Sequence, residues 1–338
     1  MKRFFAWGNR LHSGESSIPF VGKAKLWLGI AGVLVVLSLL VPLVAGFNFG
    51  IAFKGGSQFQ VDHVTDTSAA KGEKIVTEVV PASEPRLTPT SDTAVQIETN
   101  QLTDAQMQEV RVALVAGYDA EPQEVTSTFV GPEWGQDVTS KMIRALVIFV
   151  GIALVVMALY FRTWKMSIAA IVGLFAVMIV TMGIYSATGF EVTPEAIIGF
   201  LTVLSFSLYD TVVVFDKIRE NTARFQDKRK LKFSELVNLG VNQTTVRSIN
   251  TSVVSVLPIA SILFIGVFLL GAGTLVDISL SLFIGTIVAA ASTLFVASPL
   301  YALLRANEPA VQEQEKAVRE LRLKNGDADV PPVIHSEV

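Results

Sequence analysis

The sequence has no cysteine, few charged residues and few histidines. Without cysteine in its 338 residues, a disulfide scaffold, a thiolate metal site and a cysteine nucleophile are all excluded. Charged residues make up 17% of the chain, below the roughly 25% of an average soluble domain. The three histidines, His12, His63 and His335, are too widely spaced to indicate a metal cluster, so we expect no metal and no other cofactor.

Apolar residues are gathered into six long runs, and the mean hydropathy of the chain is +0.52. A run of about 20 apolar residues is long enough to cross the roughly 30 Å hydrocarbon layer of a bilayer. This pattern excludes a soluble single-domain enzyme and predicts a polytopic α-helical membrane protein with six transmembrane helices. The runs lie at about 26–47, 144–161, 167–187, 196–216, 251–270 and 278–304.

Lysine and arginine in the short connections predict the orientation in the membrane. Residues 1–25 contain five such residues and the predicted loop 217–247 contains eight, whereas 188–195 and 271–277 contain none. We therefore expect both termini in the cytoplasm, with helices 2–6 within 143–304. The tail 305–338 has helical spacing to about Lys324 and then a composition typical of disorder.

The long segment 48–142 then lies outside the cytoplasm as a domain between helices 1 and 2. Strand-like alternation occurs at 57–61 and 94–98, and a final strand is expected at 124–130. Helical spacing occurs at 69–80 and 104–116, with Thr103 or Asp104 as a cap. This order of strands and helices predicts an extracytoplasmic α+β ferredoxin-like domain.

Asp210 is an acidic residue inside the fourth apolar run. An ionisable group in hydrocarbon costs at least a few kcal/mol, which makes it a candidate functional residue. Ser207 and Thr211 lie on the same helix face and give it a narrow polar stripe. Two interpretations remain open: a proton relay, or a structural aspartate that joins two helices by hydrogen bonds.

Arg247 lies near the predicted cytoplasmic boundary, just before the fifth run. Arg247, Asn250, Thr251 and Ser255 fall on one helix face and form a second polar stripe. We expect this stripe to contact the one around Asp210, although the arginine side chain would have to extend inward to do so. The alternative is an arginine that reaches only to the membrane surface.

An enzymatic function has little support in the sequence. Neither the phosphate-binding pattern G-x-x-x-x-G-K-[ST] nor G-x-G-x-x-G is present, so energy from ATP would have to come from a partner. An intramembrane protease requires paired catalytic acids, but Asp216 lies about 240° around the helix from Asp210. A proton gradient is the available alternative source of energy.

Five short stretches of the sequence stand out as motifs. They are LYDTVVVFDKIREN at 208–221, GIAFKGG at 50–56, VGPEWG at 130–135, RSINTS at 247–252, and GTLVD at 273–277 with Pro299. These motifs resemble those of the SecD/SecF family of bacterial protein-export subunits, and within it the SecF branch. The resemblance covers about residues 20–304 and departs from the family at Ala52, where an acid is usual, and at 289–293.

The resemblance implies a half of the RND transporter type in the lipid bilayer of the bacterial inner membrane, with Asp210 and Arg247 in a proton relay. It implies a SecD partner, the SecYEG channel, a YajC-like accessory protein and translocating preproteins, with no role for nucleic acid. The junctions Gly55-Gly56 and Gly131-Pro132 would then transmit movement to the outer domain. The alternatives are an RND-type exporter of lipids or small molecules, and a passive membrane scaffold.

Overall fold

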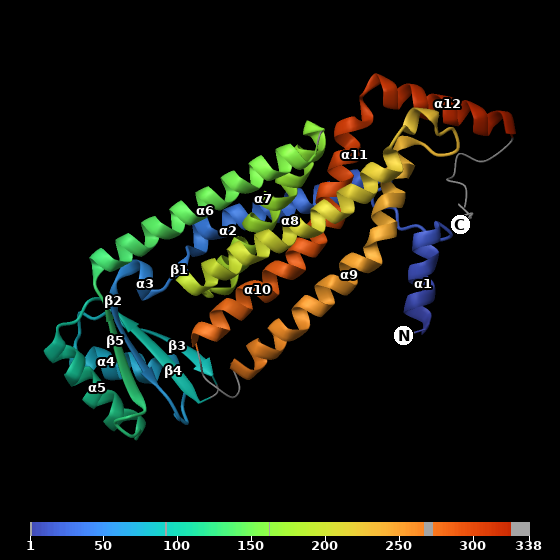
Figure 1. Ribbon diagram of the computed structural model, residues 1–338. Helices are drawn as coiled ribbons and strands as arrows, with labels where there is room; N and C mark the ends of the chain where they lie inside the picture. Colours follow the sequence, from blue (N-terminus) through green and yellow to red (C-terminus); the bar gives the residue numbers. More distant parts are fainter. Residues whose placement is uncertain (1, 92, 162, 267–272, 326–338) are drawn as a thin grey trace.

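The computed structural model describes residues 2–91, 93–161, 163–266 and 273–325. Figure 1 shows two parts: a bundle of long helices, and an α+β domain at one end of that bundle. We call this end of the bundle the domain end. Helices α1 (Lys2–Ser13), α11 (Ser298–Ala306) and α12 (Pro309–Asn325) gather toward the opposite end, which we call the tail end.

Within the described residues, six stretches of helix are long and apolar enough to cross a membrane, as the sequence predicts. The last of them, Leu275–Ala306, is irregular. It consists of α10 (Gly273–Ser292), a π-helical turn η3 (Thr293–Ala297) and α11. The other five are α2 (Ala24–Ala45), α6 (Pro132–Tyr160), α7 (Trp164–Thr188), α8 (Pro194–Thr222) and α9 (Phe233–Ile265).

Two predicted boundaries differ from the structure, because polar residues extend the helices beyond their apolar runs. Most of the predicted loop 217–247 is helical, since α8 continues to Thr222 and α9 begins at Phe233. Helix α6 begins at Pro132 instead of residue 143. Proline suits the first helical position, where its missing N–H costs nothing, so one continuous helix runs from the domain into the bundle.

The α+β domain has the predicted ferredoxin-like order of elements. Its four-stranded antiparallel sheet has the order β3-β4-β2-β5, so the first strand of the domain, β2, lies between its third and its last strands. Both helices pack on the sheet through a core that includes Phe59, Ile97 and Leu114. The elements are β2 (Gly56–Val61), α4 (Ala69–Val79), β3 (Arg86–Ser91), β4 (Ala94–Thr99), α5 (Asp104–Tyr118) and β5 (Val125–Val130).

Helix α5 begins with a capping box at Thr103. The Thr103 hydroxyl accepts a hydrogen bond from the Gln106 backbone N–H at 3.4 Å, and the Thr103 N–H donates to Gln106 Oε1 at 2.9 Å. Replacing such a cap costs about 1 kcal/mol. We expect Thr103→Ala to speed hydrogen exchange in the first turn of α5 roughly fivefold. Thr77→Ala in α4 is the control, because the Thr77 hydroxyl only bonds back to Glu73 O of its own helix.

The tail end is held by polar contacts with the first part of α9. Asn242 Oδ1 accepts a hydrogen bond from the Ile18 N–H at 2.8 Å, and Asn238 Oδ1 accepts one from the Val21 N–H at 3.0 Å. The buried Arg322 of α12 donates to both Glu235 oxygens, at 2.9 and 2.6 Å. The predicted helix in the tail is therefore present as α12, while the final stretch 326–338 lies outside the described residues.

Candidate functional site

Asp210 lies in the interior of the helix bundle. It is 4% exposed, and Ser207 and Thr211 on the same face of α8 are buried with it. The i, i+3 and i+4 spacing places these side chains together, and α8 packs this side against α9 and α10. The narrow polar stripe predicted from the sequence is therefore buried among helices.

The contacts of this stripe come from two other helices. Ser248 of α9 donates a hydrogen bond from its hydroxyl to Asp210 Oδ1 at 2.8 Å. The hydroxyls of Thr211 and Thr293 are 3.1 Å apart, and Thr293 is the first residue of the π-helical turn η3. Such turns widen a helix locally and are frequent at functional sites. Three helices therefore meet at Asp210.

The second oxygen of Asp210 is left without a partner. Asp210 Oδ2 is buried and accepts no hydrogen bond from any described residue. A buried polar atom normally has a hydrogen-bond partner, and a bare carboxylate oxygen among apolar helices is costly. Placing a proton on this carboxyl group removes its charge, so the arrangement suits a group that takes up and gives up a proton.

Arg247 lies one residue before Ser248 but on the exposed side of α9. Its Nη2 donates a hydrogen bond to the Tyr209 hydroxyl at 3.3 Å, and Tyr209 is 55% exposed. Arg247 acts on Asp210 electrostatically, but no hydrogen bond or ion pair joins them within the described part of the chain. The pair Arg247–Tyr209 thus lies beside the buried carboxylate, on an open face of the bundle.

The predicted stripe on α9 faces largely outward. Asn250 is exposed and Thr251 is half-buried, and among the described residues neither side chain is hydrogen-bonded to the stripe on α8. Ser248 makes the contact with Asp210 that was expected from this stripe. Sequence reasoning missed Ser248 and Thr293; the only available signals were the position of Ser248 beside Arg247 and the hydroxyl of Thr293 in the last apolar run.

The open face continues along α9 toward the domain end. Only 6% of the apolar window of α9 is buried, and its large apolar side chains Val254, Leu257 and Phe264 are exposed. Exposed apolar surface on a bundle of this kind faces either lipid or another protein. The exposed polar pair Arg247–Tyr209 on this face is unusual for contact with lipid, because a charge in hydrocarbon is expensive.

The two glycine junctions predicted to carry movement are in contact. Gly55 has a φ of +75° and packs against Pro132, where a Cβ on Gly55 would lie 3.0 Å from the Pro132 Cα. Gly56 has a φ of +141° and packs against the Thr99 carbonyl. Gly131 caps α6 at the residue before Pro132. Only glycine combines these backbone angles with this close approach, so the domain and α6 meet without intervening side chains.

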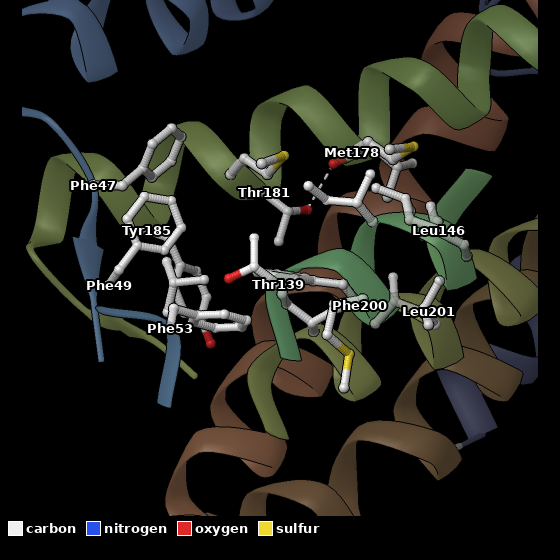
Figure 2. A pocket seen from close by; sticks show the side chains of 18 of the residues that line it. Phe47, Phe49, Phe53, Thr139, Leu146, Met178, Thr181, Tyr185, Phe200 and Leu201 are labelled. Carbon is white, nitrogen blue, oxygen red and sulfur yellow. Dashed lines mark hydrogen bonds between the residues drawn. The ribbon is translucent and has the colours of Figure 1, made fainter. Parts of the chain in front are cut away.

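An apolar cavity of about 400 Å³ lies at the domain end, among α6, α7 and α8. Figure 2 shows Phe47, Phe53 and Tyr185 on one side of it and Leu146 on another. The Thr181 hydroxyl in its wall donates to Val177 O of its own helix, as the dashed line in Figure 2 marks. The cavity does not include Asp210, so it is separate from the site around that residue.

Within the described residues, no group of three or more histidine, cysteine, aspartate or glutamate side chains is arranged to hold a metal ion.

The fold and the site define the class of protein. It is a polytopic helical membrane protein with a ferredoxin-like domain between its first two spanning helices and a carboxylate buried in the bundle.

Comparison with known proteins then gives the family. Residues 111–307 match the family model described as "Protein export membrane protein SecD/SecF, C-terminal". The chain is 37% identical to the protein translocase subunit SecF of Streptomyces coelicolor, over 94% of this chain and 85% of that protein. It is 39% identical to SecF of Mycobacterium tuberculosis H37Rv, over 93% of this chain and 73% of that protein. The chain belongs to the SecD/SecF family.

A solved structure shows the same architecture. The crystal structure of SecDF from Thermus thermophilus, titled a translocon-associated membrane protein, superposes with a TM-score of 0.75 at 26% identity. The match covers 87% of this chain but 39% of that one, so the chain spans about two-fifths of the SecDF protein. A structure of SecDF in a super-membrane-facing form superposes with a lower TM-score of 0.63.

Proposed function

We propose that this chain is a SecF-type subunit of the bacterial preprotein translocase, which uses the proton gradient to assist protein export. The observation that carries the proposal is Asp210, a buried carboxylate with one oxygen hydrogen-bonded to Ser248 and one left bare. Intramembrane carboxylates of this kind mark proton pathways. In this proposal the role of the chain is mechanical, and the proton gradient supplies the energy.

The working unit contains a second half, a SecD protein. The length of the related SecDF chain supports this, because the present chain matches two-fifths of it. The open face of α8 and α9 that carries Arg247 and Tyr209 is where that half docks, which places the arginine in a protein interface instead of lipid. The pair acts beside the SecYEG channel, with a YajC-like accessory protein as a further partner.

The chain lies in the bacterial inner membrane with its tail end in the cytoplasm. The eight lysine and arginine residues of 217–247 and the five of residues 1–25 support this orientation. The ferredoxin-like domain then lies outside, with 14 acidic and six basic residues in 48–142. There it receives the preprotein that emerges from the channel.

Protonation of Asp210 drives the movement. A neutral Asp210 no longer attracts Arg247, so α8 and α9 shift relative to the docked SecD helices. Helix α6 transmits the shift, because it is continuous from the bundle to Pro132, where it packs on Gly55 of the domain. Gly131 and Gly56 leave this contact free of side chains, so the domain follows α6 and draws the preprotein outward.

The proposal is tested by preprotein release from inverted membrane vesicles that contain SecYEG and SecD. Vesicles that lack this chain are compared with vesicles in which it is restored, each with and without an uncoupler. We expect restored vesicles to complete translocation faster, and only while the proton gradient lasts. A stimulation that survives the uncoupler supports a passive scaffold, and an RND-type exporter would leave release unaffected by the chain.

A further inference from the structure

A second group of carboxylates lies far from Asp210, where the ferredoxin-like domain meets the domain end of the helices. Glu191 belongs to the short strand β6 (Glu191–Val192) in the connection between α7 and α8. It pairs in parallel with β1 (Asn48–Phe49), the segment that leads from α2 to the domain. A side chain at Gly50 would collide with Glu191 Oε1, so the carboxyl group is enclosed by the linker itself.

The domain reaches this carboxyl group through its own sheet. Gln96 of β4 donates from one nitrogen to Glu191 Oε2 at 3.2 Å and to Glu98 Oε1 at 3.4 Å. Glu98 and Glu191 are therefore brought together at one amide nitrogen, and their side chains interact. A proton on one of them removes the repulsion between two adjacent carboxylates and allows a hydrogen bond between them, so a proton stabilises this contact between domain and helices.

The charged side chains around Glu191 are mainly acidic. Glu98 from β4 and Asp277 from α10 are the charged groups that act most strongly on Glu191, and Glu195 of α8 in turn acts on Asp277. The nearby cation Arg86 of β3 donates to Asn48 Oδ1 at 2.6 Å. A further basic group, Lys54 of α3 (Ile51–Lys54), lines a neighbouring polar cavity of about 360 Å³ with Glu84, Arg86 and Glu98.

Burial, followed by the negative charge of Glu98, raises the pKa of Glu191 to about 8. Desolvation and a like charge both disfavour the ionised form. At neutral pH the docked arrangement therefore contains a proton on this pair. If the domain moves away, water reaches Glu191 and the carboxyl group returns toward its ordinary pKa of 4.5.

We propose that Glu191 and Glu98 hold one proton between them and so latch the ferredoxin-like domain onto the helices, and that losing this proton releases the domain. This inference rests on the proposed function in one respect. The proposed orientation of the chain determines from which side of the membrane the proton reaches Glu191 and Glu98. The latch is distinct from Asp210, since it lies at the interface that the domain must open or close to move.

The direction in which docking depends on pH follows from the number of protons bound in the docked and undocked states. Between about pH 5 and pH 8 the docked state holds a proton that the undocked state lacks, so docking takes up one proton. The ratio of docked to undocked molecules therefore falls by up to tenfold for each unit of rising pH in this window, and is constant above it. An acidic outer solution favours the latched domain.

Because the sequence contains no cysteine, two introduced cysteines are its only sites for spin labels, and the distance between domain and helices can be measured directly. Two exposed positions, Gln108 on α5 and Thr188 at the end of α7, are replaced by cysteine and spin-labelled. Distance distributions are recorded in nanodiscs for the chain with a cysteine-free SecD partner, between pH 5.5 and pH 8.5. We expect a second, undocked distance to grow with pH up to about pH 8.

The test variant is Glu191→Gln, which keeps the size of the side chain and cannot lose a proton. We expect its docked fraction to be independent of pH and to match that of the unsubstituted chain at pH 5.5. Glu98→Gln is expected to weaken the pH dependence and to shift it to lower pH, because it removes the neighbouring negative charge while the burial of Glu191 remains. The matched control is Glu133→Gln, which removes an exposed acid at the same end of the molecule; it should retain the full pH dependence.

Two results would overturn the latch. One is a distance distribution of the unsubstituted chain that stays the same from pH 5.5 to pH 8.5. The other is an unchanged pH dependence in Glu191→Gln. Neither measurement involves translocation, so these experiments test the latch independently of the proposed export function.

Discussion

Replacing Asp210 by Asn is expected to abolish proton-gradient-dependent translocation while leaving the chain folded and bound to its partner. Asparagine has nearly the size of aspartate, and its side-chain oxygen still accepts the hydrogen bond from Ser248. It cannot bind and release a proton near neutral pH. The variant therefore removes the chemistry and keeps the packing of the three helices that meet at this residue.

The size of the expected loss follows from the energy in the gradient. One proton moving across 100 mV makes available about 2.3 kcal/mol. That energy corresponds to a factor of roughly 40 in an equilibrium. We expect the gradient to accelerate preprotein release by up to this factor with the unsubstituted chain, and not at all with Asp210→Asn.

Release is measured from vesicles with and without an uncoupler, after equal incorporation of the chain has been shown. Asp216→Asn is the matched control, because Asp216 lies on the same helix but is exposed and paired with Arg219 at 2.8 Å. The control should keep the full response to the gradient. Normal gradient-driven release with Asp210→Asn would rule out the proton relay and leave a structural aspartate.

The ferredoxin-like domain could be predicted from sequence because local chemistry determines most of it. Alternation of apolar residues defines strands β2 and β4, and Thr103 marks the start of α5 by the cap it forms. The strand order then follows from the sequence of elements. Each of these signals lies within a few residues, so no distant contact is needed to read it.

The limits of the long helices were harder to predict, since hydropathy detects only their apolar parts. The first turns of α9 bury Phe233, Val237 and Val241 in the core, but polar residues separate these side chains, so they form no continuous apolar run. Two of the polar residues, Asn238 and Asn242, are hydrogen-bonded to the segment before α2, more than 200 residues away, and such contacts cannot be inferred from hydropathy. The hydropathy pattern therefore predicts a loop at 217–247, where the structure has the ends of two helices.

The candidate site, too, could be predicted from the sequence only in part. Asp210 is evident in the sequence because a charge in an apolar run is rare. Ser248 and Thr293 are not evident, because they depend on how three helices pack around a π-helical turn. The outward direction of Arg247 also follows from packing, since one residue of shift on α9 exchanges the buried Ser248 for the exposed Arg247.

Replacing Gly135 by Val is expected to uncouple the domain from the helix bundle. Gly135 lies one turn into α6, where a Cβ would be 2.6 Å from the Phe53 carbonyl oxygen and 3.0 Å from the Phe53 carbonyl carbon. Both are backbone atoms of α3, so they cannot move aside as a flexible side chain would. Overpacking of this kind costs about 3 kcal/mol, and α6 must separate from α3 to relieve it.

We expect a lower midpoint of thermal unfolding for the purified complex, and loss of gradient-driven release even though Asp210 is intact. Gly151→Val is the control: Gly151 lies on the same helix, but a Cβ at this position would have no described atom within 4 Å, so its substitution should leave both measurements almost unchanged. If Gly135→Val lowers the unfolding midpoint but leaves gradient-driven release normal, then α6 does not transmit the movement. The connection through α2 and β1 would then be the remaining route from Asp210 to the domain, because it is the other covalent link between the two parts.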